Sequence, residues 1–320
     1  MIASTTRRSR LAAVGAFVAA GALLLSACGD QTDDAGNGDD GGESSAEGSS
    51  GGDEGGTGGA ADLLPQEIRD AGEITVGSDI AYAPIEFIDE NDEIAGIDPD
   101  IGAALGEVLG VEFTFENGTF DGLILGMNNG RYDVIMSAMT DTAERQQGAS
   151  ADAEGGGADF VNYFQAGSAI LVEAGNPEGI QSQDDLCGLT VAAQQGTANE
   201  ALIEAQQEAC DEPIETMIND VDSDSITALQ NGRAQAVITD YPVALYNELT
   251  AGGGELFEVT GDQIDAAPYG IAVPKEETEL RDALQAAMQE IIDNGTYADI
   301  LAEWNAEAGA IEEATVNAGE

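Results

Sequence analysis

The amino-acid sequence predicts an α/β protein with largely parallel sheets, built from two similar units. Patterns typical of strands and of helices alternate from residue 73 onward. One pattern occurs twice, as NGRYDVIM at 129–136 and as NGRAQAVI at 231–238, although a match this short can also arise by chance. Residues 63–320 are numerous enough for two lobes, each with its own core.

The first 27 residues have the pattern of an export signal. Three arginines precede an apolar run at 11–25, and this run leads into the lipobox sequence LSAC, which ends at Cys28. Such a segment is too short and wrongly flanked for a lasting transmembrane helix. We therefore expect residues 1–27 to be a signal peptide and lipid, such as palmitate, on Cys28 to anchor the chain to the cell membrane. A plain secretory signal followed by a chance cysteine is the alternative.

The export route and the segment after the signal follow from the same stretch of sequence. Arg10 stands where a twin-arginine signal needs an apolar residue, so the general export route is favoured. Residues 29–62 consist mainly of Gly, Ser, Asp and Glu, with no aromatic and no basic residue. Because this composition buries little apolar surface, we expect residues 28–62 to form a lipidated, disordered tether.

Charge and composition exclude several classes of function. Residues 1–27 carry three of the nine basic residues and no acidic one, so the remainder has 62 acidic and six basic residues, a net charge of −56. This excludes nucleic acid and anionic lipid as partners and indicates adaptation to high salt. Histidine is absent, which excludes His-based triads and His-ligated zinc. We expect no metal and no cofactor.

The elements of the folded part can be assigned in order. Residues 73–77 predict the first strand, and Asp98 predicts the N-cap of a helix with Pro99 at its first position and Gly110 at its end. Near the C-terminal end, Leu280, Leu284, Met288 and Ile291 form an apolar stripe that stops at Asn294. A last short helix follows around Ile300 and Trp304, and we expect Trp304 to anchor packing.

Polar residues follow the strands at the edge where ligands collect in parallel sheets. After the strand at 134–136 come Ser137, Ala138, Thr140 and Arg145, and after the strand at 236–238 comes Asp240. The guanidinium group of Arg145 suits a carboxylate, and Asp240 suits an ammonium group, so the two suit a zwitterion. Two further groups belong at this edge: the turn and helix start at Gly196, Thr197 and Ala198, and Asp79 with Tyr82 beyond the first strand.

The two remaining cysteines, Cys187 and Cys210, predict a disulfide, because a pair of thiols in an exported protein is usually oxidised. Two free buried thiols are the alternative.

In these motifs the sequence resembles the family 3 solute-binding proteins of polar amino acid ABC transporters. The resemblance covers residues 62–305. Its motifs are VGSDIAYAPIEF at 76–87, GIDPDI at 96–101, RYDVI at 131–135, TDTAER at 140–145, QGT at 195–197, DYP at 240–242 and YGIAV at 269–273.

The resemblance implies a two-lobed periplasmic-binding-protein-like fold of type II with two crossover strands as its hinge. The crossovers would lie near 163–168 and 262–268, which makes 63–165 and 267–320 lobe one and 166–266 lobe two. It also implies that Arg145 with Thr140 holds the ligand α-carboxylate and that Asp240 holds the α-ammonium group. Tyr82 and Phe120 would be aromatic walls, and Asp79 would face the ligand side chain. An amino acid, permease subunits and the membrane are then the partners of a monomer that is not an enzyme.

The sequence departs from the family pattern at three places, and two other functions are alternatives. Pro99 replaces an aliphatic residue of the family pattern, Ala198 replaces a hydroxyl residue, and the loop at 146–158 is longer and rich in glycine. Some relatives resemble cyclohexadienyl dehydratases, so an enzyme on this scaffold is one alternative. A co-receptor of a sensor is another.

The scarcity of basic residues leads to an expectation about the ligand. Arg145 is assigned to the α-carboxylate, and the patterns place Arg131 and Arg233 before their strands, at the far ends of the sheets. An acidic ligand side chain would lack a counter-charge. We therefore expect a polar amino acid with a neutral side chain, glutamine above all, or else a cationic one. Ser137 could bond a side-chain amide.

Overall fold

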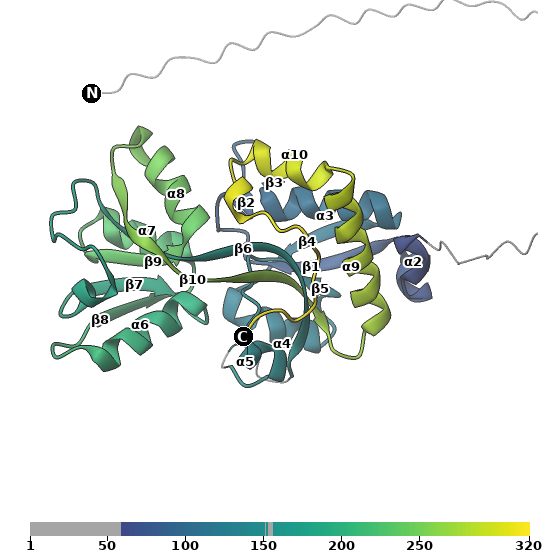
Figure 1. The fold of residues 1–320 in the computed structure, drawn as a ribbon, viewed down its shortest axis with the longest axis horizontal. Coiled ribbons are helices and arrows are strands. Elements are labelled where there is room, and N and C mark those ends of the chain that lie inside the picture. Colours follow the sequence, from purple (N-terminus) through teal and green to yellow (C-terminus); the bar gives the residue numbers. More distant parts are fainter. Residues whose placement is uncertain (1–58, 151, 153–155) are drawn as a thin grey trace, which may run out of the picture. The chain divides into compact units, whose positions relative to one another are not determined.

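The computed structural model describes residues 59–150, 152 and 156–320 (Figure 1). The predicted signal peptide, Cys28 and nearly all of the predicted tether lie outside these residues. The last residues of the predicted tether instead form helix α1 (Ala60–Leu63), because Ala60 is buried in the hydrophobic core. The short 3-10 helices span Phe120–Gly122, Gln183–Leu186, Ala251–Gly253 and Glu307–Gly309.

Lobe one contains a parallel group of three strands covered by helices. Strand β1 (Glu73–Ser78) lies between β4 (Glu112–Asn117) and β5 (Val134–Ile135). A small hairpin, β2 (Phe87–Ile88) and β3 (Ile94–Ala95), precedes helix α3. The helices of this lobe are α1, α2 (Gln66–Ala71), α3 (Ile97–Leu109), α4 (Leu123–Asn128), α5 (Ala143–Gln147), α9 (Thr278–Asp293) and α10 (Thr296–Glu303).

Lobe two repeats this arrangement. Strand β7 (Thr190–Gln194) lies between β8 (Glu215–Asn219) and β9 (Ala236–Asp240), and both pairings are parallel. Its helices are α6 (Ala198–Ala209), α7 (Asp222–Gln230) and α8 (Tyr241–Thr250). The order β4-β1-β5 in lobe one therefore corresponds to β8-β7-β9 in lobe two.

Two long antiparallel strands, β6 (Ala158–Glu173) and β10 (Phe257–Pro274), run through both lobes (Figure 1). Their pairing joins all the long strands into one eight-stranded sheet, β4-β1-β5-β10-β6-β9-β7-β8. The two units therefore share one sheet instead of having separate ones, because β10 pairs with β5 of lobe one, β6 pairs with β9 of lobe two, and β6 and β10 pair with each other. The predicted crossover segments, 163–168 and 262–268, lie within these strands, and the register of their pairing shifts around Ile264.

The sequence repeat corresponds to a repeated turn. Gly130 and Gly232 both adopt left-handed φ angles, of 74° and 67°, which glycine allows without steric cost. In lobe one, Asp133 then accepts a hydrogen bond from the backbone N–H of Thr75 at the start of β1 (2.7 Å). In lobe two, Gln235 accepts the matching bond from Thr190 of β7 (2.7 Å). The repeat thus describes two helix-to-strand turns that are each fastened to the neighbouring strand.

The helix expected to begin at Asp98 begins one residue earlier, at Ile97, with Gly96 as its N-cap. Asp98 does not cap the helix, because its side chain accepts hydrogen bonds from Tyr163 and from the backbone N–H of Ala138 instead. Gly110 ends the helix as expected. The indole N–H of Trp304 donates to Asp100 (2.7 Å), which fastens the end of α10 to α3.

The residues after α10 form a C-terminal tail that returns to lobe one. Val316 pairs with Val161 of β6, and the backbone N–H of Asn317 donates to Phe160. Gly319 donates to the carboxylate of Asp141 and accepts a hydrogen bond from Gln146 of α5. The C-terminal end therefore lies beside α5 (Figure 1).

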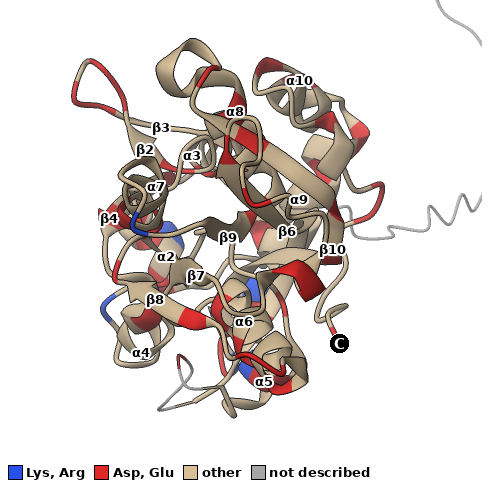
Figure 2. Cartoon of the chain, turned by 90° about the vertical axis from the view of Figure 1, so that its left-hand side faces the viewer, with Lys and Arg blue, Asp and Glu red and all other residues tan. Residues whose placement is uncertain are grey.

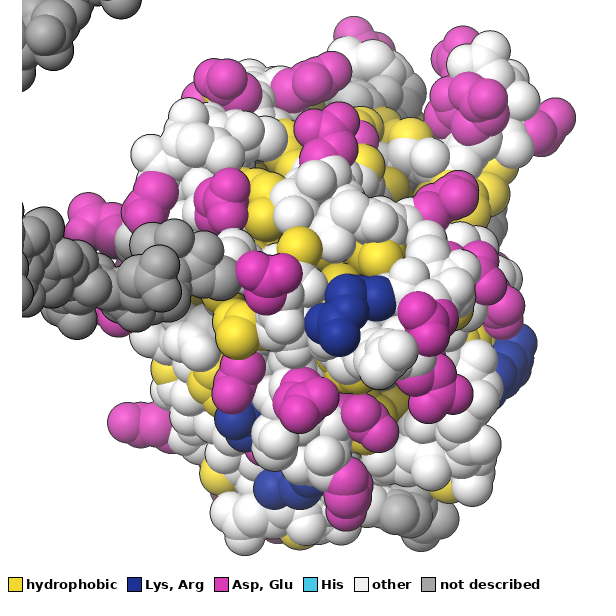
Figure 3. Space-filling view, turned by 90° about the vertical axis from the view of Figure 1, so that its right-hand side faces the viewer, with side chains coloured by type: hydrophobic (Ala, Val, Ile, Leu, Met, Phe, Trp, Pro, Cys, Tyr) yellow, Lys and Arg dark blue, Asp and Glu magenta, His cyan; other side chains and the backbone are white. Residues whose placement is uncertain are grey.

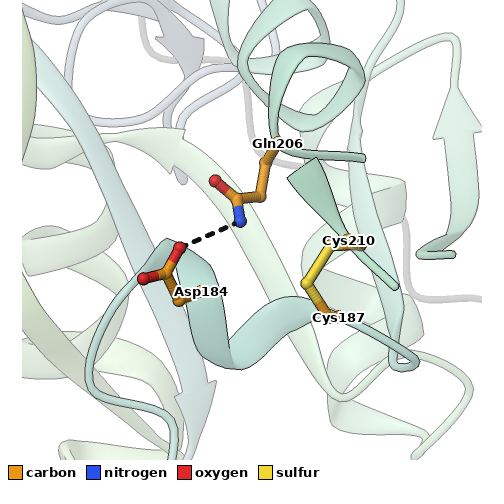
Figure 4. The surroundings of a disulfide bond; sticks show 4 residues. All are labelled: Asp184, Cys187, Gln206 and Cys210. Atoms are coloured by element: carbon orange, nitrogen blue, oxygen red, sulfur yellow. Dashed lines mark hydrogen bonds between the residues drawn. A yellow bond between two sulfur atoms is a disulfide. The ribbon is translucent and has the colours of Figure 1, made fainter. Parts of the chain in front are cut away.

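The structure contains the disulfide predicted between Cys187 and Cys210, with a Cα–Cα distance of 5.5 Å. Figure 4 shows it joining the short helix at Gln183–Leu186 to the end of α6. Beside it, the amide of Gln206 donates a hydrogen bond to Asp184 (3.3 Å). The disulfide therefore fixes the C-terminal end of α6.

Acidic residues occur along much of the chain and basic ones are few (Figure 2). On the face that Figure 3 shows, acidic side chains are spread over the surface with few basic ones between them. Of the six basic residues outside the signal segment, Arg69, Arg131, Arg233 and Lys275 are exposed. Arg281 is partly buried and pairs with Asp159 (2.8 Å) and Asp282 (2.7 Å). Within the described ranges, no helix is both long and apolar enough to span a bilayer.

Removing the disulfide is expected to destabilise lobe two. The cross-link closes a loop of 23 residues, for which loop closure predicts a contribution of about 3 kcal/mol. The double variant Cys187→Ser, Cys210→Ser should therefore lose about 2–3 kcal/mol in free energy of unfolding, measured by denaturation in high salt. The same loss on reduction of the wild-type chain would support this account, and no loss in either experiment would contradict it.

Candidate functional site

A pocket lies where the carboxyl ends of two parallel strands from lobe one meet those of two parallel strands from lobe two. Asp79 follows β1, Ser137 follows β5, Gln194 ends β7 and Asp240 ends β9. The pocket has an empty volume of about 320 Å³, part of it open to solvent. Its lining comprises Asp79, Tyr82, Glu86, Phe120, Ser137, Ala138, Thr140, Gln194, Thr197, Ala198, Asn199 and Asp240.

Nine of the ten residues predicted to bind ligand line this pocket, and the tenth, Arg145, lies beside it. That these residues contact a ligand remains a prediction. Sequence reasoning missed Glu86, Gln194 and Asn199. Gln194 and Asn199 flank the turn that was selected, so the rule that points to strand ends could have found them. Glu86 reaches the pocket because it pairs with Tyr82 in an isolated bridge, and no sequence signal indicated that pairing.

Arg145 lies on α5, where Thr142 caps the helix by accepting a hydrogen bond from the backbone N–H of Arg145. The guanidinium group is 5.3 Å from the centre of the Phe120 ring. Its Nη1 donates to the carbonyl of Thr140 (2.8 Å) and its Nη2 to the carbonyl of Gly196 in lobe two (2.9 Å). Arg145 therefore connects the two lobes.

The third acceptor of Arg145 is the carboxylate of Asp152, 2.7 Å from Nε. Both side chains are 4 % exposed. Asp152 belongs to the long glycine-rich loop at 146–158, of which residues 151 and 153–155 lie outside the described residues. A guanidinium group has five N–H donors. Three have acceptors among the described residues, which leaves one on each terminal nitrogen, the arrangement that a carboxylate can accept in two parallel hydrogen bonds.

Asp240 is held by neutral donors. Its Oδ1 accepts from the amide of Asn199 (2.9 Å) and its Oδ2 from the hydroxyl of Tyr269 (2.6 Å). Each carboxylate oxygen keeps a second lone pair for a further donor. The amide oxygen of Asn199 is buried and has no donor within the described part of the chain. An ammonium group in the pocket could donate to both side chains.

Three further hydrogen bonds cross between the lobes at the pocket. The Tyr82 hydroxyl bonds to the Thr239 hydroxyl (3.2 Å) and accepts from the backbone N–H of Asp240 (3.1 Å). The amide of Gln194 donates to the carboxylate of Asp79. At the helix start, the N–H of Gly196 donates to Glu200 (2.6 Å). The N–H group of Gly196 is therefore already bonded, and Thr197 and Ala198 remain as the lining residues of that turn.

The carboxyl groups of the site are strongly affected by burial. Burial raises the pKa of Asp79 to about 6, although its hydrogen bond from Gln194 opposes the shift. Burial likewise raises the pKa of Asp222, behind the pocket, to about 7 and raises the pKa of Asp240. No lining side chain is basic. The site therefore favours positive charge. The described part of the chain has no group of three residues suited to hold a metal ion.

Residues 74–307 match the family described as bacterial extracellular solute-binding proteins, family 3. The chain belongs to this family. The predicted resemblance and the two-lobed α/β fold are thereby confirmed.

Three known proteins illustrate the similarity. An arginine-binding protein of Corynebacterium glutamicum is 32 % identical, and the match covers 80 % of this chain and 81 % of the relative. The structure of an ancestral arginine-binding protein bound to glutamine is 34 % identical with a TM-score of 0.66, over 74 % of this chain and 99 % of that one. An ancestral amino acid-binding protein, a precursor of cyclohexadienyl dehydratase, is 31 % identical with a TM-score of 0.66, over 75 % and 98 %.

The raised pKa values predict that the unliganded protein loses stability as the pH rises. A carboxyl group whose folded pKa is raised binds more protons in the folded state between its unfolded and folded pKa values, so stability falls with pH in that window. For Asp79 this window runs from pH 3.8 to about 6, and for Asp222 it runs from pH 3.8 to about 7. We expect the free energy of unfolding in high salt to fall by several kcal/mol from pH 4.5 to 7.5.

The variant Asp222→Asn separates this effect from general charge repulsion, because it removes one of the buried carboxyl groups. Its free energy of unfolding should fall less steeply with pH than that of wild type. The exposed control Asp299→Asn should follow wild type. Equal slopes for Asp222→Asn and wild type would show that Asp222 is not the source.

Proposed function

We propose that this protein captures an amino acid with a cationic side chain outside the cell and delivers it to an ABC transporter. One observation carries this proposal: a small pocket between two lobes has several buried carboxyl groups and, among the described residues, one neighbouring guanidinium group. A zwitterion with an additional positive charge complements that distribution.

Arg145 and Asp240 suit the two ends of the ligand backbone. The two remaining N–H groups of Arg145 can bind an α-carboxylate, with Thr140 and the start of α6 beside them. Asp240 and the amide oxygen of Asn199 can accept from an α-ammonium group. Since the two ends belong to different lobes, a ligand that contacts both favours the closed arrangement.

Asp79 and Glu86 suit the ligand side chain. Both line the pocket, and none of the described residues that line it with them is basic. The preference for a cationic side chain is also supported by relatives that are named as arginine-binding proteins. Glutamine is the second candidate, because one of these similar proteins was solved with glutamine bound, and Ser137 and Gln194 can bond an amide.

The cellular setting belongs to the same proposal. The family consists of extracellular proteins, and the lipobox supports anchoring to the membrane through lipid on Cys28. We infer that the chain acts as a monomer, that permease subunits are its protein partners and that it performs no chemistry. The boundaries of the lobes, 63–165 with 267–320 and 166–266, remain part of this proposal. Metabolic labelling with a fatty acid in the native host would test the anchor, because the label should disappear in Cys28→Ser.

Turnover of a bound molecule is the rival function. A buried carboxyl group such as that of Glu86 could act as a general acid, and one similar structure is a precursor of cyclohexadienyl dehydratase. Incubation with prephenate or arogenate distinguishes the two functions, because product would support the enzyme and unchanged substrate the receptor.

Replacing either end of the backbone clamp should weaken ligand binding. Truncating one partner of a buried charged contact costs about 2–5 kcal/mol, so Arg145→Met and Asp240→Asn should each raise the dissociation constant for arginine well over tenfold. Arg233→Met and Asp299→Asn carry the same changes at exposed positions and should bind as wild type does. Calorimetry that finds either site variant within threefold of wild type would remove that residue from the site.

The charge of the pocket predicts the order of ligand affinities. In titrations at neutral pH and high salt, arginine and lysine should bind tightest, glutamine and asparagine less tightly, and glutamate and aspartate weakest. The reason is that an acidic side chain would be buried beside Asp79 without a counter-charge. Glutamate or aspartate binding tightest would contradict the electrostatic reasoning.

A further inference from the structure

Two buried carboxyl groups at the pocket, those of Glu86 and Asp98, lie close to one another. Glu86 directly precedes β2, and Asp98 lies in the first turn of α3. Both residues have a relative exposure of 0 %. Glu86 also lines the pocket, whereas Asp98 lies behind it. A buried carboxylate is costly unless a donor or a positive charge compensates it.

Each of the two groups is only half satisfied by hydrogen bonds. Glu86 Oε1 accepts from the hydroxyl of Ser137 (2.7 Å). Asp98 Oδ2 accepts from the hydroxyl of Tyr163 (2.9 Å) and the backbone N–H of Ala138 (3.1 Å). The other two oxygens, Glu86 Oε2 and Asp98 Oδ1, are buried and have no donor among the described residues.

The two residues are held side by side: the backbone N–H of Asp98 donates to the carbonyl of Ile85, the neighbour of Glu86 (3.0 Å), and their carboxyl groups bond to the adjacent residues Ser137 and Ala138. Two ionised carboxylates cannot donate to one another, but a single proton between them provides both with a partner. Such a proton belongs to the pair rather than to either residue.

Within the part of the chain that the structure describes, the groups that contact the pair are acids and neutral donors. Asp79 acts on Glu86 from the end of β1, and Ser137, Ala138 and Tyr163 provide neutral groups from the segment after β5 and from β6. Burial raises the pKa of both residues, and for Glu86 the adjacent charge of Asp98 raises it further.

We propose that Glu86 and Asp98 share one proton while the pocket is empty and release it when a cationic ligand side chain enters. This inference rests on the proposed function, because it needs a cationic amino acid beside Glu86. The charge exchange balances: one proton leaves to the buffer, one positive side chain enters, and both carboxyl groups are ionised in the complex. A neutral ligand such as glutamine brings no charge, so the pair keeps its proton. The pair thereby lets one pocket accept both cationic and neutral ligand side chains.

Calorimetry of the mature chain at pH 6 tests this inference. Heats of arginine binding in buffers that differ in ionisation enthalpy give the number of protons released. Asp79, Asp222 and Asp240 can also release protons, so the difference between variants is informative. Glu86→Gln should release up to one proton fewer per arginine than wild type, while the exposed control Glu112→Gln should equal wild type. For glutamine, wild type and Glu86→Gln should release equally few protons.

The affinity should show the same linkage. Where binding releases one proton, the dissociation constant falls about tenfold for each unit by which the pH rises. Wild type should therefore show a steeper pH dependence for arginine than Glu86→Gln. Equal proton release and equal pH dependence in the two proteins would overturn the proposal that arginine binding releases the shared proton. If arginine does not bind to wild type at all, the proposed ligand class is wrong, and release of the proton by a cationic ligand is wrong with it.

Infrared spectroscopy keeps the shared proton itself testable even if Glu86→Gln does not fold. Unliganded wild type labelled with ¹³C in its Glu and Asp carboxyl groups should show an isotope-shifted carboxylic-acid band at pH 8, where Asp79 and Asp222 are ionised. Arginine should remove the band and glutamine should not. Absence of the band before ligand is added would overturn the proposal whatever the ligand is. Persistence of the band with arginine bound would overturn the release step alone.

Discussion

The burial of acids without an equal number of bases is the constraint on which the site depends. Among the described residues, six carboxyl groups lie buried in or near the pocket, those of Asp79, Glu86, Asp98, Asp152, Asp222 and Asp240. Apart from the pairing of Arg145 with Asp152, the donors that hold them are neutral hydroxyls, amides and backbone N–H groups. Neutral donors fix the positions of carboxylates without cancelling their charge. The empty site therefore keeps a negative potential that protons or a ligand must offset.

The repeated units explain why this charge collects in one place. Each unit presents the carboxyl ends of its parallel strands, and the two long strands bring these ends face to face. Asp79 lies at the end of a strand in lobe one and contacts Gln194 of lobe two. Asp240 lies at the end of a strand in lobe two and contacts Tyr82 of lobe one. A change in the angle between the lobes would alter all of these contacts together.

Much of the fold could be predicted from the sequence, because glycine turns, capping residues and apolar stripes act locally. Gly110 and Gly232 are examples: each has a left-handed φ angle that its position after a helix predicts. Most of the pocket could be predicted too, since strand ends and family motifs indicate where side chains gather. The remainder depends on contacts between distant segments. Asp98 was assigned to a helix cap, but its partners lie 40 and 65 residues away.

The same limit explains what was missed at the site. Glu86 enters the pocket through a bridge within its own turn, and its neighbour Asp98 arrives with α3. Asp152 reaches Arg145 from a loop whose composition indicated only that it was long and rich in glycine. Contacts made by turns and irregular loops leave no periodic pattern in a sequence, so these partners became visible only in three dimensions.

The C-terminal tail has a practical consequence for protein production. Its last residues bond to Asp141 and Gln146, and Gln146 is the neighbour of Arg145 on α5. An affinity tag fused after Glu320 would begin within this contact and could displace the short helix that holds the guanidinium group. Replacing the predicted export signal with an N-terminal tag avoids that disturbance. A purification strategy for this protein is therefore best designed from the N-terminal side.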